Sequence, residues 1–393
     1  MRKITADWVY PINQDPIPEG VVIINEAGQI QQLDIRSNYD ISELEIHKGV
    51  IIPGFVNTHC HLELSHMKGK VNTGTGLIPF ITNVVQQRGA SEATIQEAIA
   101  QADLEMYENG IVAVGDISNV IDTFSQKAVS KLRYYTFTEF FDFLQSSNAQ
   151  VEFDKYKAVY DQLVLPTAHQ KSCVPHAPYS VSPELFKLIN AVNAGEKRTV
   201  SIHNQETPPE NQLFLEKKGG FVDFYGGFGI ALDGFEASQQ PSINYALKYM
   251  DPNHRTLFVH NTLSTAADIQ AAHAWGKEVY WATCPNANLY IENNLPNYQA
   301  FIDNDAQMTI GTDSLTSNWQ LSILEELKTI AKYQSYVPFQ TLLKWATLNG
   351  ARALGFEDDL GSIEVGKSCG LNLLYDLNQK GELGKDTKVK RLV

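Results

Sequence analysis

Cysteine is scarce in this chain of 393 residues, and long apolar runs are missing. The four cysteines are far apart and form no CxxC pair: Cys60, Cys173, Cys284 and Cys369. Such spacing argues against a disulfide framework and cysteine-based zinc sites, and it is typical of a reducing compartment. No stretch reaches the roughly eighteen apolar residues of a membrane-spanning helix, and the first residues show no signal-peptide pattern. We therefore expect a cytoplasmic protein with no membrane partner.

Positive charge is also in short supply. The chain has 31 lysines and arginines against 45 acidic residues, so its formal net charge is −14. Because nucleic-acid binding needs a basic surface to neutralise phosphates, we expect no nucleic-acid partner, although a small nucleoside substrate is compatible with this charge. A glycine-rich phosphate-binding fingerprint is missing after the first apolar strand, which counts against a doubly wound nucleotide-binding sheet.

The middle of the sequence is a regular alternation of apolar runs and helical patterns. Most intervals between the runs have helical periodicity, as in ATIQEAIAQADLEMYENG. Strands that alternate with helices predict parallel βα units, and eight units fit a (β/α)8 TIM barrel better than an open sheet. The eight apolar, β-branched or aromatic runs are GVIIPGFVNTH, GIVAVGDI, LRYYTFTEF, SCVPHAPYS, RTVSIHN, TLFVHNT, VYWATCPN and AQMTIGTDS.

The two ends of the chain differ from this middle part. Short strand patterns broken by turns occupy the first fifty residues, and GSIEVGKSCGLNLLYDL near the C-terminus has the same character. We therefore predict an α/β protein in which a small β-sandwich domain, built from residues 1–52 and 356–393, is attached to a barrel of residues 53–355.

Histidines and one aspartate stand where the predicted strands stop. His59 and His61 end the first run, and alternate residues of a strand face the same side, so both imidazoles can point into the barrel mouth. His203 ends the fifth run and Asp313 the eighth, and the carboxyl ends of all strands meet at one face of such a barrel. Imidazole nitrogens with one carboxylate suit a divalent cation such as Zn²⁺, which would lower the pKa of a bound water towards neutrality.

These segments together resemble the amidohydrolase superfamily, on the branch that holds guanine deaminase, adenosylhomocysteine deaminase and the triazine chlorohydrolases. The resemblance extends over nearly the whole chain, through PGFVNTHCHLE, CVPHAPYSVSPEL, SIHNQE, VHNT, CPNAN and GTDSLTSN. It implies a metal-dependent hydrolase in which one divalent ion, zinc in the first place and iron in the second, is held by His59, His61, His203 and Asp313. Relatives with two metals usually carry a carboxylated lysine at the end of strand 4, where this chain has His176.

The resemblance also implies catalytic roles. Glu206, three residues after His203, would protonate the ring nitrogen next to the attacked carbon, and such proton transfers contribute about 10²- to 10⁴-fold each. Asp313 would take the proton of the attacking water and pass it to the leaving group. His260, at the end of the sixth run, would orient the nucleophile or stabilise the developing charge.

Substrate contacts are predicted for three other residues. His176 would face the tail of the heterocycle, Glu63 would contact substrate or satisfy a nearby polar group, and Trp319 would stack on a flat ring or belong to the core. The motifs HCHLELS and HNQET resemble those of 6-aminodeoxyfutalosine deaminases, which serve a menaquinone pathway. The expected reaction is therefore deamination of an aminated purine nucleoside, with adenosylhomocysteine and methylthioadenosine as the next candidate substrates. The resemblance also implies a homodimer.

Three alternatives stay open. Chlorohydrolases and cyclic amidases use the same activated water, although Glu206 favours deamination because ring protonation is most needed when ammonia leaves. A barrel without enzymatic activity would have lost metal ligands, whereas this chain keeps all four candidates. An adenosine-deaminase-like barrel uses related ligands but usually lacks a split β domain.

Overall fold

Each of the eight apolar runs of the sequence contributes one strand to two four-stranded parallel sheets. The computed structural model describes residues 1–164 and 166–393. The sheets have the strand orders β11-β10-β9-β8 and β12-β13-β14-β15. The strands are β8 Phe55–Cys60, β9 Ile111–Ser118, β10 Arg133–Phe140, β11 Gln170–Pro175, β12 Thr199–Asn204, β13 Arg255–His260, β14 Val279–Thr283 and β15 Gln307–Ile310.

The two parallel sheets meet at the ends of their edge strands. Between β11 and β12, the backbone N–H of His203 donates to the carbonyl oxygen of His176 over 2.9 Å. Between β15 and β8, the backbone N–H groups of Thr312 and Asp313 both donate to the carbonyl oxygen of His59 over 3.0 Å. These bonds bring the carboxyl ends of the first, fourth, fifth and eighth strands together.

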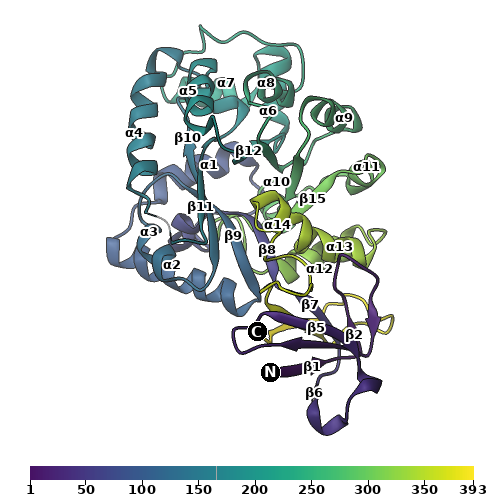
Figure 1. The fold of residues 1–393 in the computed structure, drawn as a ribbon. Coiled ribbons are helices and arrows are strands. Elements are labelled where there is room, and N and C mark those ends of the chain that lie inside the picture. The colour runs from purple at the N-terminus through teal and green to yellow at the C-terminus, as the bar shows by residue number, and fades with distance from the viewer. Residues whose placement is uncertain (165) are drawn as a thin grey trace.

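Helices fill the connections and surround the strands (Figure 1). Their starts follow local chemistry: the Ser182 hydroxyl caps α5, with Pro183 at its first position, and Thr265 with Asp268 forms a capping box on α9. The helices are α1 Leu77–Gln87, α2 Glu92–Glu108, α3 Phe124–Val129, α4 Ala149–Gln162, α5 Pro183–Asn193, α6 Pro208–Glu216, α7 Gly220–Gly227, α8 Ser242–Tyr249, α9 Ala266–Trp275, α10 Pro285–Glu292, α11 Tyr298–Asp303, α12 Ile323–Tyr333, α13 Phe339–Ala346 and α14 Leu348–Leu354.

A second apolar cluster lies beyond the carboxyl ends of the strands, apart from the main core. It joins Met67, which follows β8, to the α7 region. The ring of Phe221 stacks on Tyr179 with centroids 4.2 Å apart, and the Tyr225 hydroxyl donates to the Tyr179 carbonyl oxygen. The glycine-rich segment 224–235 between β12 and β13 is therefore held by buried aromatic residues, including Phe235 at its end.

The ends of the chain build two further sheets in the lower part of Figure 1. Their strand orders are β5-β4-β1-β6 and β17-β16-β7-β2-β3, and β16 near the C-terminus pairs antiparallel with β7. One buried apolar cluster takes Ile4 from the first sheet and Ile51 and Leu371 from the second. The strands are β1 Arg2–Thr5, β2 Trp8–Val9, β3 Ile17–Pro18, β4 Gly20–Ile24, β5 Ile30–Ile35, β6 Glu45–Ile46, β7 Val50–Pro53, β16 Leu371–Tyr375 and β17 Lys388–Arg391.

One expected strand is in fact two. The run GVIIPGFVNTH reads as a single strand, but it divides at Gly54 into β7, which joins the terminal sheets, and β8, which joins the parallel sheets. The chain passes so close to its neighbours there that a Cβ on Gly54 would lie 2.2 Å from the Val112 side chain and 2.9 Å from the Cys369 carbonyl oxygen. Glycine is the residue that permits such an approach.

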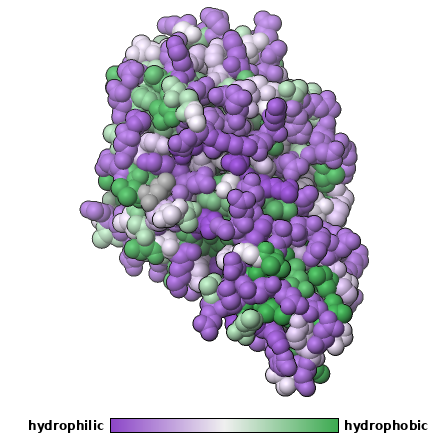
Figure 2. Space-filling model, in the orientation of Figure 1, coloured by the Kyte–Doolittle hydropathy of each residue, from purple (hydrophilic) through white to green (hydrophobic). Residues whose placement is uncertain are grey.

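The exposed residues at the surface of the protein are mostly polar. Figure 2 shows a mostly hydrophilic face, with apolar side chains gathered over the terminal sheets and the adjoining helices. Among the helices of residues 1–164 and 166–393, none is long and apolar enough to cross a membrane.

Candidate active site

Three imidazoles converge at the carboxyl ends of β8 and β12. The Nε2 atoms of His59 and His61 are 3.2 Å apart, and those of His61 and His203 are 3.3 Å apart. His59 is fully buried and His203 nearly so. His59 lies on β8 and His61 directly follows Cys60, the last residue of that strand, and both imidazoles face the same side, as their spacing predicts.

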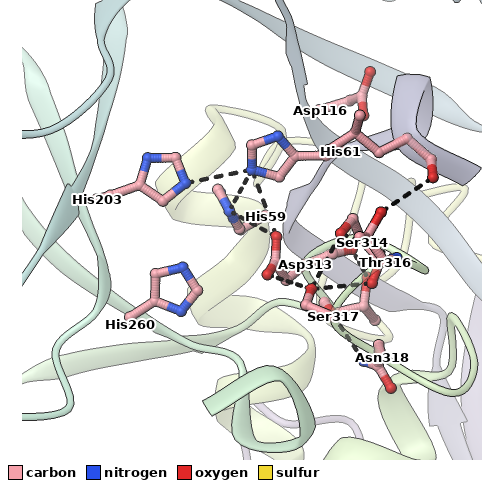
Figure 3. Close-up of polar contacts among 12 residues, drawn as sticks. His59, His61, Asp116, His203, His260, Asp313, Ser314, Thr316, Ser317 and Asn318 are labelled. Atoms are coloured by element: carbon pink, nitrogen blue, oxygen red, sulfur yellow. Dashed lines mark hydrogen bonds and ion pairs between the residues drawn. The ribbon is translucent and has the colours of Figure 1, made fainter. Parts of the chain in front are cut away.

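Asp313 completes this group from the segment after β15. Its Oδ1 lies 3.6 Å from His59 Nε2 and 3.5 Å from His61 Nε2, while its Oδ2 accepts a hydrogen bond of 2.5 Å from Ser317 Oγ. Figure 3 shows the four side chains pointing towards one another. We call His59, His61, His203 and Asp313 the ligand cluster.

The ligand cluster fits a small divalent cation. Two ligands 2.0–2.1 Å from a tetrahedral zinc ion lie about 3.3 Å apart, which matches the Nε2 separations of 3.2 and 3.3 Å. His203 Nδ1 faces the His176 carbonyl oxygen at 2.8 Å, so this nitrogen carries the proton and Nε2 keeps a free lone pair. Burial lowers the pKa of His61 to about 4 and also lowers that of His59, so neutral, ligand-competent imidazoles are favoured.

A carboxyl–imidazole pair lies beside the ligand cluster. Oε1 of Glu206 is 3.7 Å from Nε2 of His260. His260 Nδ1 contacts the Asn288 side-chain oxygen at 2.9 Å, which places its proton there and leaves Nε2 to face the site. Burial lowers the pKa of His260, whereas burial and the nearby charge of Asp313 raise that of Glu206 well above its usual value. The arrangement favours a neutral imidazole next to a carboxyl group that keeps its proton.

The three predicted substrate contacts have different surroundings. His176 lies against His203, with ring centroids 4.9 Å apart, and its Nδ1 is 2.6 Å from Ser180 Oγ. Glu63 is buried, and its Oε2 accepts hydrogen bonds from the backbone N–H groups of Asn119 and Val120, so this oxygen holds the segment after β9. Trp319 packs on Tyr290 but remains 52% exposed. These contacts are all within the protein, so the predicted roles of the three residues in substrate binding remain predictions.

Comparison with known proteins identifies the family. The sequence profile of the amidohydrolase family matches residues 50–391. The chain belongs to this family. The resemblance carried by the motifs and the expectation of a hydrolase are therefore confirmed.

Relatives of this amidohydrolase cover most of its length. A Helicobacter pylori protein named adenosine deaminase is 26% identical over 363 residues, which are 91% of this chain and 86% of the relative. A 5-methylthioadenosine/S-adenosylhomocysteine deaminase of Bacillus cereus (strain AH187) is 25% identical over 406 residues, with coverages of 97% and 86%. The crystal structure of Helicobacter pylori aminofutalosine deaminase with methylthio-coformycin has a TM-score of 0.82 at 23% identity and covers 100% of both chains, which supports a common fold.

Sequence reasoning missed a buried acid beside His203 in the amidohydrolase site. Glu139, near the end of β10, has Oε1 3.4 Å from His203 Nδ1, and its Oε2 accepts a hydrogen bond from the Asn119 side chain. Burial raises the pKa of Glu139 to about 8. The signal was present in RYYTFTEF, where an acid closes an apolar run as Asp313 follows the eighth run.

Three residues at these strand ends have a left-handed backbone. Gln205, His260 and Asp313 have φ angles of 46°, 72° and 56°, in the left-handed region. Side chains other than glycine adopt such angles at a cost of about 1–3 kcal/mol, and residues of this kind cluster at functional sites, where the surrounding structure holds them. In this amidohydrolase all three lie in the candidate active site, which supports a functional reason for the strain.

Another buried acid ties two loops of the site together. Oε2 of Glu326 on α12 accepts from the backbone N–H of Asn286 at 2.8 Å, and its Oε1 accepts from the side chains of Asn286 and Asn318 at 3.0 and 2.8 Å. These asparagines follow β14 and β15, respectively. Glu326 therefore links the segment after the seventh strand to the segment that contains Asp313.

Glu326 should make the stability of the amidohydrolase depend on pH. Burial raises its pKa from 4.5 to about 8, so between these values the folded chain keeps a proton that the unfolded chain has lost. We expect the free energy of unfolding to fall as pH rises through this window. The glutamine of Glu326→Gln cannot ionise. This variant should therefore lose less unfolding free energy than wild type between pH 5 and 8.5, by on the order of 2 kcal/mol. Urea unfolding at both pH values measures it, with Glu325→Gln as the half-exposed control. Equal slopes in wild type and Glu326→Gln would contradict the prediction.

Proposed function

We propose that this amidohydrolase is a metal-dependent deaminase of an aminated purine nucleoside or a related N-heterocycle. The observation that carries the proposal is the convergence of the ligand cluster with the buried Glu206–His260 pair. A nucleophile and a proton donor are the two groups that replacement of an aromatic amine by a hydroxyl requires. Both kinds of group lie here on the same face of the strands.

We propose that the ligand cluster holds one divalent ion, with zinc first and iron second. The ion, when bound, supplies a water that is activated at neutral pH. A single ion is supported by the place of Lys171, which lies near the start of β11 and donates to the carbonyl oxygens of Tyr160 and Leu163. Its ammonium group is thus engaged at the opposite end of the strand from His176.

Each polar residue then has a chemical task. Asp313 accepts the proton of the attacking water, and the Ser317 hydroxyl keeps its carboxylate oriented. Glu206, whose raised pKa favours the protonated form, donates a proton to the ring nitrogen. The neutral His260, fixed by Asn288, turns its Nε2 to the site and orients the nucleophile. When the C–N bond breaks, Asp313 passes its proton to the departing ammonia, and the proton of the new hydroxyl group returns to the Glu206 carboxylate.

The substrate proposal rests on two deaminase relatives together with the site. These relatives are named for adenosine and for 5-methylthioadenosine or S-adenosylhomocysteine, which share an aminated purine on a ribose. We propose a 6-aminodeoxyfutalosine-like nucleoside first and adenosylhomocysteine or methylthioadenosine next. His176 lies close enough to His203 to contact the heterocycle or its tail, while Glu63 would contact the substrate and Trp319 would stack on its flat ring.

We also propose the architecture that the sequence predicts. The eight parallel strands form one closed (β/α)8 barrel of residues 53–355, and the bonds from His203 to His176 and from Asp313 to His59 support its two seams. Residues 1–52 and 356–393 form a β-sandwich around their shared apolar cluster. A homodimer stays a prediction.

Ammonia release against a small panel tests the function. The metal-loaded protein is assayed with 6-aminodeoxyfutalosine, adenosylhomocysteine, methylthioadenosine, adenosine, guanine and cytosine, after metal content is measured by mass spectrometry. We expect fast turnover of one purine nucleoside and about one equivalent of zinc or iron per chain. No ammonia release from any member of the panel, with metal present, would contradict the purine proposal. Chlorinated triazines and cyclic amides would then be tested as substrates.

A further inference from the structure

The segment that carries Glu206 makes an unfavourable turn. Strand β12 ends at Asn204. The next residue, Gln205, has a φ of 46°, and Glu206 follows it directly. A glutamine gains nothing by itself from a left-handed backbone. Contacts from elsewhere must therefore hold this turn and, with it, the direction of the Glu206 side chain.

Glu210 supplies these contacts from the first turn of α6. Its carboxylate is completely buried. Oε1 accepts hydrogen bonds from the backbone N–H of Gln205 at 2.9 Å and from Ser242 Oγ at 2.6 Å, and Oε2 accepts from the backbone N–H of Glu206 at 3.1 Å. Two consecutive backbone N–H groups thus share one carboxylate, and hydrogen bonds to a charged acceptor are among the stronger ones in proteins.

The same turn is tied to the segment after β13. The side-chain oxygen of Gln205 accepts from Ser264 Oγ at 2.5 Å, and its carbonyl oxygen accepts from the backbone N–H of Leu263 at 3.0 Å. The backbone N–H of Asn261, next to His260, donates to the Asn204 carbonyl oxygen at 3.0 Å. The position of Glu206 relative to His260 therefore depends on the backbone that Glu210 holds.

We propose that Glu210 is a positioning residue, which fixes the backbone of Gln205 and Glu206 so that the Glu206 carboxyl group faces His260 and the substrate. The inference rests on the proposed function, because Glu206 is the proton donor there. A shift of about 1 Å in such a group can cost roughly 10²-fold in rate. Glu210 contributes to catalysis through this geometry and touches no reacting atom.

Glu210→Gln is the sharpest substitution, because it keeps the size of the side chain. Its amide has only one acceptor oxygen, so its NH₂ group must face one of the two backbone N–H groups and leave that donor buried without a partner. Burial raises the pKa of Glu210 to about 7, so assays at pH 8.5 compare the variant with an ionised wild type. We expect kcat to fall about 10- to 100-fold, with KM within about 3-fold and metal content unchanged.

Asp103→Asn is the matched control. Asp103 is also a buried acid with three donors, from Ser130, Tyr134 and Gln126, but it lies on α2 away from the ligand cluster. We expect a loss of stability in this variant without a change in kcat per folded molecule. An equal fall of kcat in Asp103→Asn would show that the effect of Glu210→Gln is a general consequence of destabilisation and would overturn the proposal.

A double-mutant cycle decides whether Glu210 acts through Glu206. If it does, the double variant Glu206→Gln/Glu210→Gln should be no slower than Glu206→Gln alone. The glutamine at position 206 has no proton to donate, so moving it should not lower kcat further. If the double variant loses kcat by the product of the two single fold-losses, the two residues act independently and the proposal is overturned. A kcat of Glu210→Gln within 2-fold of wild type would also overturn it.

Amide hydrogen exchange tests the hold on the backbone without any substrate. The peptide of residues 203–212 should exchange faster in Glu210→Gln than in wild type and unchanged in Asp103→Asn. Unchanged exchange in Glu210→Gln would overturn the proposal. An inactive wild type with faster exchange in this variant would instead contradict the proposed reaction, so the two failures are distinguishable.

Discussion

Replacement of Asp313 by asparagine should lower kcat/KM by more than about 10³-fold. The Asp313 carboxylate is the only anionic member of the ligand cluster, and it is also the proposed acceptor of a proton. Asparagine keeps the size of the side chain and tolerates the left-handed φ of 56°. It removes the negative charge and the basicity together, so bound metal should fall as well.

The measurement is steady-state ammonia release together with metal content after dialysis. Asp376→Asn is the matched control, because Asp376 has the same backbone conformation, with a φ of 55°, at an exposed position in the terminal sheets. We expect this control to retain wild-type metal content and rate. Full activity of Asp313→Asn with a normal metal content would refute both proposed tasks of Asp313.

Replacement of Glu206 by glutamine should lower kcat by about 10²- to 10⁴-fold and leave metal content unchanged. Glutamine fills the same buried space but has no acidic proton to give to the ring nitrogen. Because burial and Asp313 raise the pKa of Glu206, wild-type kcat should be present below that raised pKa and be lost as pH rises through it. Glu206→Gln should lack this alkaline limb.

A pH–rate profile of both proteins measures the effect, and Glu216→Gln on the exposed end of α6 serves as the control. A variant that loses less than 10-fold in kcat on its best purine substrate would show that deamination does not need Glu206. The proposed proton donation by Glu206 would then be wrong, and Glu206 would no longer favour deamination over chlorohydrolase or amidase chemistry.

The strands and the ligand cluster could be predicted from the sequence because each leaves a local signal. Apolar β-branched runs identify strands, and polar residues that close such runs gather at one face when the strands are parallel. His59, His61, His203 and Asp313 follow this rule, and they lie within hydrogen-bonding or ion-pairing distance of one another in the structure. The position of these four residues at the strand ends was therefore predictable from the sequence, whereas their assignment as metal ligands came from the family resemblance and remains a proposal.

What the sequence did not predict depends on contacts between distant segments. Gly54 divides an apparently continuous strand because the chain packs there against Val112 and Cys369, which nothing in the run itself reveals. Glu210 and Glu326 read as ordinary helical acids in the sequence, and only the fold shows that both are buried against backbone N–H groups. Periodicity reports which side of a helix is apolar but not which acid has a partner across a loop.

Because β7 pairs with β16, this sheet can be completed only after the C-terminal part of the chain has been synthesised. Pro53 pairs with Leu371, and the C-terminal strand β17 lies at the edge of its sheet and pairs with β16. At about 5–20 residues per second, the ribosome makes Leu371 roughly 15–60 s after Pro53. During that interval the apolar residues of β7 have no strand on this edge, and all eight parallel strands, from β8 to β15, are made before β16. Loss of the last two strands would therefore leave the newly made chain with an open, aggregation-prone edge.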